Sequence, residues 1–277
     1  MNLKEIYLDI KSKLSSAGIE SPEFEAKQII GQALSVPGHK ILTDGGELKE
    51  GDVNKIYEMA GKRASRYPLQ YILKQWEFYS LPFKVGEGVL IPRPDTEILV
   101  ERALGWLKTK GAATVIDLGS GSGCIAVAIA KHAMQAKVYA LEKYPQALKY
   151  LKQNVKLNRA DVTVLEGDIS SPPDMAFDLI VSNPPYIESR KISGLMPEVR
   201  FEPYTALDGG EDGLIFYRTI CSLWAGRLSP GGGIMVEVGE GQHLQVAELF
   251  KAAGLINTGF STDLNGIVRV VEGFKPL

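Results

Sequence analysis

Residues 114–130, TVIDLGSGSGCIAVAIA, decide the fold of this chain. The β-branched residues 114–116 predict a short strand, residues 117–123 form a glycine-rich turn, and the apolar residues 124–130 predict a helix packed on a sheet. Glycine permits positive φ and lets the backbone approach a ligand closely. No Lys-Ser/Thr pair follows, which disfavours a P-loop, and Cys124 departs from the dinucleotide-binding spacing. The turn therefore predicts a ligand site of another kind in an α/β protein.

Acidic residues accompany three successive predicted strands. Asp117 precedes the first glycine, where a carboxylate favours a cationic ligand. Glu142 ends the strand predicted over 136–141, about 20 residues past the turn, where an acid can bind both ribose hydroxyls of a nucleoside. Asp168 follows the strand predicted over 162–165 and would reach an adenine edge. Each acid alone is compatible with a helix N-cap or a solvated loop. Together they predict a site for S-adenosylmethionine (SAM), a nucleoside that carries a sulfonium.

The tetrapeptide Asn183-Pro184-Pro185-Tyr186 follows an apolar run, 177–182, that predicts a buried parallel strand. Two prolines forbid further sheet pairing and fix a rigid turn. An Asn at the carboxyl end of such a strand lies where open α/β sheets bind ligands. Its carboxamide has an acceptor and two donors, which suits a planar NH2 group such as an amide or a base amine. The alternative is a plain strand-terminating turn.

Composition is compatible with a globular protein of one large or two smaller cores, because 45% of the 277 residues are hydrophobic. The net charge is −2, and the lack of a long basic run weakens any case for a broad phosphate-binding surface. Cys124 and Cys221 are expected to be reduced core residues. His39, His132 and His243 are scattered, so no metal site is expected. Without a signal peptide or a membrane-spanning run, we expect a cytoplasmic protein with no membrane partner.

The chain divides into three predicted parts. Residues 1–75 have helical apolar periodicity and predict a helical substrate-recognition domain, with a merely stabilising cap as the alternative. Residues 76–87 predict a β-hairpin linker. Residues 88–277 predict the catalytic domain, in which alternating strands and helices indicate a parallel sheet. Within it, residues 231–233 are expected to open a strand over 234–238, and residues 267–271 to form an edge strand.

Residues 88–97, GVLIPRPDTE, lead into a helix that is expected to begin near Asp95, Thr96 and Glu97. Asp95 or Thr96 is a suitable N-cap, which is the structural interpretation. We favour a functional role, because in a doubly wound fold this helix start would lie beside the glycine turn.

Five segments together resemble the HemK/PrmC family of class I SAM-dependent methyltransferases, which modify the side-chain nitrogen (N5) of a glutamine in peptide chain release factors. The resemblance covers essentially the whole chain. Its segments are residues 68–72 (PLQYI), 91–97 (IPRPDTE), 117–123 (DLGSGSG), 183–187 (NPPYI) and 200–207 (RFEPYTAL). The NPPY motif alone also occurs in adenine-N6 and some guanine-N2 methyltransferases, whereas PRPDTE and RFEP select the glutamine branch.

The resemblance implies a Rossmann-like α/β fold with a mostly parallel seven-stranded sheet and a small N-terminal helical domain. It implies a monomer that acts on the Gly-Gly-Gln glutamine of class 1 release factors, and the charge balance adds the expectation of no direct nucleic-acid partner. SAM would be bound by Asp117, Gly119, Ser120, Gly121, Ser122, Gly123, Glu142, Asp168, Ile169 and Asn183. Asn183, Pro184, Pro185 and Tyr186 would form the catalytic motif and hold the substrate amide. Arg93, Glu97, Arg200 and Glu202 would shape the substrate entrance.

Two other classes of function remain open from the residues. One is an NPPY methyltransferase that acts on a ribosomal-protein glutamine or on a base amine of nucleic acid. The nearly balanced charge of residues 1–85 argues against nucleic acid. The other is a SAM-binding protein without catalysis, which would be expected to have lost the turn at Asp117 or at Asn183.

Overall fold

The computed structural model describes residues 2–36 and 48–277. His39 lies outside the described residues. The chain divides into two compact units, Met1–Gln75 with Met196–Phe201, and Trp76–Leu195 with Glu202–Leu277. We call them the helical unit and the sheet unit and describe each by itself.

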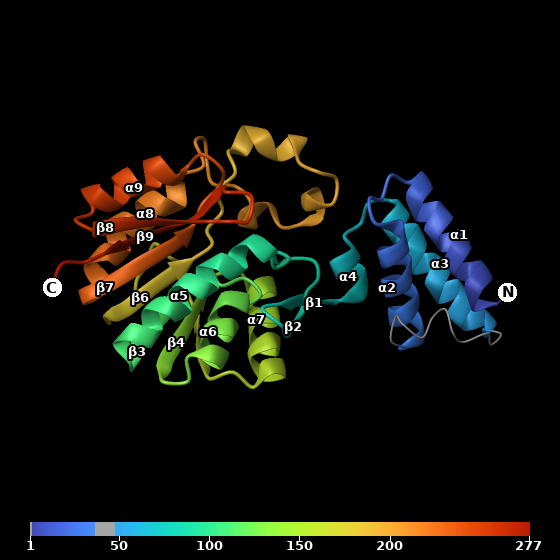
Figure 1. The fold of residues 1–277 in the computed structure, drawn as a ribbon, viewed down its shortest axis with the longest axis horizontal. Coiled ribbons are helices and arrows are strands. Elements are labelled where there is room, and N and C mark those ends of the chain that lie inside the picture. The colour runs from blue at the N-terminus through green and yellow to red at the C-terminus, as the bar shows by residue number, and fades with distance from the viewer. Residues whose placement is uncertain (1, 37–47) are drawn as a thin grey trace. The chain divides into compact units, whose positions relative to one another are not determined.

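The helical unit contains α1 (Leu3–Ser16), α2 (Pro22–Leu34), α3 (Glu50–Ala64) and the short α4 (Leu69–Leu73) (Figure 1). Asn2 caps α1 by accepting the Glu5 N–H at 2.9 Å, while the Glu5 carboxylate accepts the Asn2 N–H at 3.0 Å. The apolar stripe of α1 is buried, as are Ile29 and Ile30 of α2 and Ile56 of α3, and α1 packs against both of these helices. Burial of these stripes stabilises helices that would be marginal alone.

The segment Met196–Phe201 belongs to the helical unit although it is distant in sequence. Arg63, on α3, is almost fully buried and forms ion pairs with Glu25 at 2.5 Å and with Glu198 at 2.9 Å. The Tyr67 and Phe201 rings meet edge to face, 5.1 Å between centroids. The segment is therefore fixed to the helices by charge-assisted hydrogen bonds and an aromatic contact.

The sheet unit is built on seven strands in the order β5-β4-β3-β6-β7-β9-β8 (Figure 1). The first five strands pair in parallel, and β9 pairs antiparallel with both β7 and β8. The strands are β3 (Ala113–Leu118), β4 (Ala136–Glu142), β5 (Val162–Glu166), β6 (Phe177–Ser182), β7 (Leu228–Glu237), β8 (Ile256–Thr262) and β9 (Val268–Phe274). The fold is thus a Rossmann-like α/β arrangement with a mostly parallel seven-stranded sheet, as predicted.

Helices cover both faces of this sheet. One core contains buried residues of α5 (Glu97–Lys110), α6 (Cys124–His132) and α7 (Pro145–Asn158). The other contains buried residues of α8 (Ile215–Trp224) and α9 (His243–Ala252), with Trp224 fully buried. Because both faces are covered, the central strands are apolar throughout rather than alternating, which explains runs such as 177–182.

A separate two-stranded hairpin precedes the main sheet. Its strands are β1 (Gln75–Phe78) and β2 (Leu81–Lys84). Tyr79 and Ser80, in the turn, both have positive φ, the backbone that a two-residue hairpin turn requires. Asn154 of α7 accepts the Lys84 N–H at 2.6 Å and donates to the Lys84 carbonyl at 3.0 Å. The hairpin is therefore anchored to α7.

Two strand predictions were wrong. β9, which contains residues 267–271 only in part, is internal, and the edge strand is β8, INTGFST. The polar and glycine residues of β8 weaken its strand pattern, whereas an edge strand needs less apolar surface. β7 begins at Leu228 rather than at Ile234, because the glycines at 231–233 lie within it. A Cβ on Gly232 would lie 2.9 Å from the Asp178 carbonyl oxygen, so the close strand approach there needs glycine.

Among the described residues, no helix is both long and apolar enough to span a membrane.

Candidate active site

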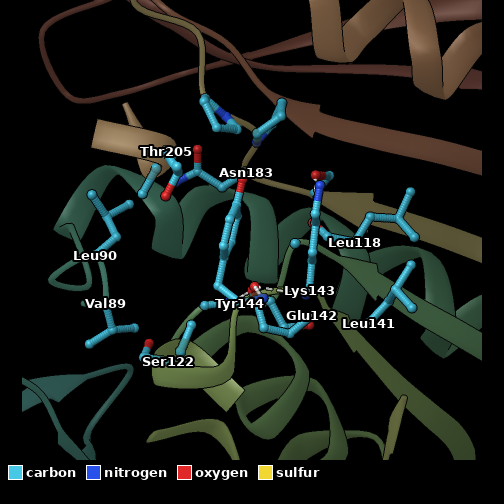
Figure 2. Close-up of a pocket in the computed structure, with 18 of the residues that line it drawn as sticks. Val89, Leu90, Leu118, Ser122, Leu141, Glu142, Lys143, Tyr144, Asn183 and Thr205 are labelled. Carbon is cyan, nitrogen blue, oxygen red and sulfur yellow. Dashed lines mark hydrogen bonds between the residues drawn. The ribbon is translucent and has the colours of Figure 1, made fainter. Parts of the chain in front are cut away.

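A cavity of about 260 Å³ opens at the carboxyl ends of β3, β4 and β6. Figure 2 shows Asn183 and Thr205 at one end and Glu142 toward the other, with Leu118 and Leu141 along one side. Parallel strands present their carboxyl ends on one edge, which is where doubly wound sheets bind ligands.

The glycine turn after β3 forms one wall of the cavity. Gly119, Ser120, Gly121 and Ser122 line it, and Gly123 lies behind them as the N-terminal residue before α6. Gly123 has φ of +80°, and a Cβ there would lie 2.4 Å from Leu151 Cδ1. By contrast, a Cβ on Gly119 would meet no protein atom within 4 Å. Glycine at 123 allows tight packing, and glycine at 119 leaves room in the cavity.

Glu142, at the end of β4, is the acid that organises this wall. One carboxylate oxygen accepts the Gly121 N–H at 2.8 Å, and the other accepts the N–H groups of Lys143 at 2.9 Å and Tyr144 at 2.8 Å. The side chain is nearly buried but lines the cavity. A carboxylate has about four lone-pair sites. Three are used by the backbone, so capacity for one further donor remains.

Asp168 and Ile169, after β5, form the next part of the lining. Asp168 pairs with Lys143 at 2.7 Å and accepts the Ser170 N–H at 2.9 Å, and these hydrogen bonds lower the pKa of its carboxyl. The Ile169 carbonyl accepts the indole N–H of Trp224 at 2.7 Å. Both residues are therefore held in place by the protein itself.

Asp117 differs from the other two acids, because it is fully buried beneath the turn and does not line the cavity. Its Oδ2 accepts the Ala126 N–H at 3.3 Å near the start of α6, and its Oδ1 has no hydrogen-bond partner among the described residues. Burial raises the pKa of this carboxyl to about 7. The approach of a cationic ligand to Asp117, expected from its place in the sequence, is not a direct contact in this geometry.

The NPPY motif begins immediately after β6. Asn183, Pro184 and Pro185 line the cavity, and the Asn183 Nδ2 donates to Thr96 Oγ1 at 3.0 Å. Tyr186 does not line it; its hydroxyl donates to Glu237 Oε1 at 3.4 Å.

The backbone behind the motif is clamped. Gln242 Nε2 donates to the Tyr186 carbonyl at 3.0 Å, and the Gly209 N–H donates to the Ile187 carbonyl at 2.8 Å. A Cβ on Gly213 would lie 2.4 Å from the Tyr186 carbonyl oxygen. The turn that contains the two prolines is thus packed closely against the backbone of residues 209–213 and is hydrogen-bonded to Gln242.

The four expected entrance residues lie in different places. Arg93 lines the cavity and pairs with Glu202, which is buried and also accepts the Ile91 N–H at 2.9 Å. Glu97 accepts the Tyr79 N–H at 2.7 Å, so its carboxylate holds the hairpin turn. Arg200 is exposed and belongs to the helical unit.

Four further residues of the site were not singled out for roles from the sequence. Lys143 and Tyr144 extend from the end of β4 along the cavity (Figure 2). Thr96 was named only as a possible N-cap within a helix start for which a functional role was favoured, and its side chain makes no capping bond. Glu237 was missed, although an acid at the end of the apolar run IMVE was a visible signal. Among the described residues, no three His, Cys, Asp or Glu side chains are placed to hold a metal ion.

This fold and site define a methyltransferase. The methyltransferase small domain model matches residues 95–198, which contain the glycine turn and the NPPY motif. A solved structure, the T. thermophilus 16S rRNA N2 G1207 methyltransferase (RsmC) in complex with AdoMet and guanosine, shares this fold with a TM-score of 0.51. It is 19% identical, and the match covers 73% of this chain and 49% of that one.

Comparison with curated relatives is more specific. The PrmC N-terminal domain model matches residues 5–73. The release factor glutamine methyltransferase of Geobacter sulfurreducens is 43% identical, over 94% of this chain and 92% of its own length. That of Moorella thermoacetica is 40% identical, over 92% and 91%. The chain belongs to the release factor glutamine methyltransferase family.

Proposed function

We propose that this chain transfers the methyl group of SAM to the side-chain amide nitrogen (N5) of the glutamine in the Gly-Gly-Gln motif of class 1 peptide chain release factors. The main observation behind this proposal is the orientation of Asn183, whose side-chain NH2 group donates a hydrogen bond to Thr96. Its carbonyl oxygen is left as an acceptor at the cavity, which matches an incoming NH2 group. The release factor is assigned as the substrate from the family to which the chain belongs.

The residues around the cavity fit SAM. The apolar side chains of Leu118, Leu141 and Ile169 suit an adenosine, and the free space at Gly119 suits the methionine part. Glu142 has one lone-pair site left for a ribose hydroxyl, and Asp168 with Ile169 would flank the adenine. SAM supplies an electrophilic methyl group on a sulfonium when bound. S-adenosylhomocysteine is the product.

The chain's own residues must orient a poor nucleophile. The amide nitrogen's lone pair is delocalised, and the rotation barrier of roughly 18–20 kcal/mol for a peptide amide bounds the cost of losing that overlap. Asn183 Oδ1 and the Pro184 carbonyl would accept hydrogen bonds from the glutamine NH2, while Pro185 and Tyr186 support the wall. Orientation of this kind supplies about 7–11 kcal/mol in favourable cases. Acceptors gain strength as positive charge develops on the nitrogen.

Proton removal follows the transfer and goes to water in this proposal. The titratable side chains of the cavity wall do not supply a free strong base among the described residues. Glu142 and Asp168 already accept backbone and Lys143 hydrogen bonds, and burial raises the pKa of the Cys124 thiol to about 12. Catalysis therefore rests on positioning.

The proposed organisation assigns substrate recognition to residues 1–75, a linker to the hairpin at 76–87 and catalysis to residues 88–277. Arg93, Arg200 and Glu202 would shape the entrance, and Glu97 would support it through the hairpin. We propose a monomer that acts in the cytoplasm on a protein substrate, without direct contact to nucleic acid.

The test is methyl transfer from radiolabelled SAM to purified release factor and to its Gly-Gly-Gln→Gly-Gly-Ala variant, side by side. Label on the first and none on the second is the expected result. Equal label on both would place the modification at another residue. No label on either, with SAM still bound, would overturn the release-factor assignment and direct the search to ribosomal proteins and base amines.

A further inference from the structure

A chain of buried hydrogen bonds lies behind Asn183. Asn183 Nδ2 donates to Thr96 Oγ1 at 3.0 Å, and the Thr96 hydroxyl lies close enough to the Glu237 carboxylate to lower the pKa of that group. The Tyr186 hydroxyl donates to the same carboxylate. Thr96 and Glu237 are each 2% exposed. The chain connects the start of α5, the end of β7 and the NPPY turn within the sheet unit.

When the Glu237 carboxylate is ionised, every hydrogen bond of this network has a defined donor and acceptor. A carboxylate only accepts hydrogen bonds, so the Tyr186 hydroxyl donates to it and the nearby Thr96 hydroxyl is oriented to donate toward it. The Thr96 oxygen is then left as an acceptor, which only the NH2 end of the Asn183 carboxamide can satisfy. Its oxygen end is thereby turned away from Thr96. If the Thr96 hydroxyl donated to Asn183 instead, the carboxamide would be reversed and would present an NH2 group to a substrate NH2 group.

Burying the Glu237 carboxyl is costly, because no ion pair with a described residue offsets the loss of hydration. Glu237 Oε2 has no hydrogen-bond partner among the described residues. An apolar residue would end β7 at lower cost in desolvation. Thr96 does not cap α5, so neither side chain has a structural task in the helix start. Thr96 and Glu237 instead determine the orientation of the Asn183 carboxamide.

We propose that Thr96 and Glu237 are positioning residues for methyl transfer, which fix the Asn183 carboxamide with its oxygen toward the substrate amide. The inference rests on the proposed function, since it assigns the acceptor role of Asn183 to a defined network. It adds two residues that act through Asn183; Thr96 also lines the cavity, whereas Glu237 does not.

The first test compares Thr96→Val, which keeps the shape of the side chain but removes the hydroxyl, with Thr96→Ser, which keeps the hydroxyl. We expect kcat for release factor methylation to fall at least about 10-fold in Thr96→Val, with SAM Kd and release factor KM within about 2-fold of the wild type. Thr96→Ser should recover most of kcat. Thr109→Val, the same change at the exposed end of α5, is the matched control and should leave kcat unaltered. Wild-type kcat in Thr96→Val would overturn the proposal.

The second test uses pH. Burial raises the pKa of the Glu237 carboxyl to about 7. The titratable or charged groups that act on it are Asp95, Arg269, Tyr186, Tyr217 and Cys124. Protonation below pH 7 lets the carboxyl donate and removes the fixed direction of the chain, so kcat should fall on the acid side. In Glu237→Gln this acid limb should disappear. Its persistence in Glu237→Gln would exclude Glu237 from the positioning role.

A third readout needs no protein substrate. The side-chain NH2 signals of Asn183, assigned by their loss in Asn183→Asp, should be protected from exchange in the wild type and unprotected in Thr96→Val. Protection without any methylation of release factor would overturn the proposed function but retain the orientation of Asn183. Equal exchange in both proteins would overturn the positioning role whatever the substrate.

Discussion

The carboxylate of Glu142 holds the backbone around the cavity and is also the proposed ligand of the SAM ribose. Its oxygens hold the glycine turn through Gly121 and the following loop through Lys143 and Tyr144. Charge-assisted hydrogen bonds of this kind contribute about 1.5–3 kcal/mol each. Loss of the charge would therefore relax the cavity wall as well as remove the proposed ribose contact.

Replacing Glu142 by Gln should weaken SAM binding about 10- to 100-fold, because the amide NH2 cannot accept the backbone N–H groups. The SAM Kd, measured by calorimetry, checks this. Glu166→Gln, at the exposed end of the neighbouring β5, is the control and should bind SAM normally. An unchanged Kd in Glu142→Gln would reduce Glu142 to a loop-capping residue.

Replacing Asn183 by Ala should lower kcat about 10²–10³-fold, the scale seen when one preorganised polar group aimed at transition-state charge is removed. SAM binding should change little, because the proposed partner of the Asn183 carboxamide is the glutamine amide rather than the ribose or adenine of SAM. Single-turnover methyl transfer and SAM Kd together check this. Near-normal turnover would contradict the positioning mechanism.

Asp117 gives a pH-dependent stability. Burial holds the native pKa of its carboxyl near 7, above the ordinary 3.8. The native state therefore retains a proton that the unfolded chain loses between about pH 4 and 7, so stability falls as pH rises through this window. Asp117→Asn carries no charge at any pH and should gain about 2–3 kcal/mol over the wild type between pH 5 and pH 8. Thermal unfolding at both pH values checks this, with the exposed Asp161→Asn as control. An equal gain at both pH values would refute it.

At the scale of elements, the NPPY turn depends on the loop beneath it. Gly213 has φ of +75° and lies against the Tyr186 carbonyl, so Gly213→Ala introduces both backbone strain and a clash. We expect a loss of roughly 1–3 kcal/mol in stability and a fall in kcat as the turn is displaced. Chemical denaturation with a parallel activity assay checks this. Gly226→Ala, where a Cβ meets nothing within 4 Å, is the control. A fully active, fully stable Gly213→Ala would show that the loop yields.

Elements could be predicted from the sequence where local burial or backbone conformation restricts the choice of residue. The apolar run of β6 and the glycine turn before α6 were recognised because burial on both faces and positive φ restrict residue choice directly. The edge strand β8 was missed because none of its residues is fully buried. Thr96, Glu237 and Asn183 meet only through tertiary packing, since the nearest two are 54 positions apart in the chain. No local pattern encodes such a contact, although a lone acid in an apolar strand marks one of its members.

At the scale of the whole molecule, the helical unit depends on a segment from the middle of the chain. Glu198 holds Arg63 and also pairs with Arg66 at 2.8 Å. Glu198→Ala leaves the buried Arg63 with Glu25 as its remaining recorded ion-pair partner, and removing one partner of a buried ion pair is costly.

We therefore expect Glu198→Ala to lose about 1–3 kcal/mol and to exchange amide hydrogens faster in α3 and in residues 196–201. Hydrogen-exchange mass spectrometry checks both. Glu58→Ala, which removes the exposed partner of Lys62 on α3, should have little effect. Wild-type exchange in Glu198→Ala would mean that the aromatic contact of Phe201 holds the segment by itself.

The division of the chain has a consequence for protein engineering. Because the helical unit includes Met196–Phe201, the polypeptide enters it again after leaving at Gln75. A chimera that exchanges only the first 75 residues with a relative would give Arg63 and Tyr67 of one parent to the Glu198 and Phe201 positions of the other. A transplant of recognition specificity therefore has to carry two separate pieces of sequence, and a simple N-terminal fusion junction is not enough.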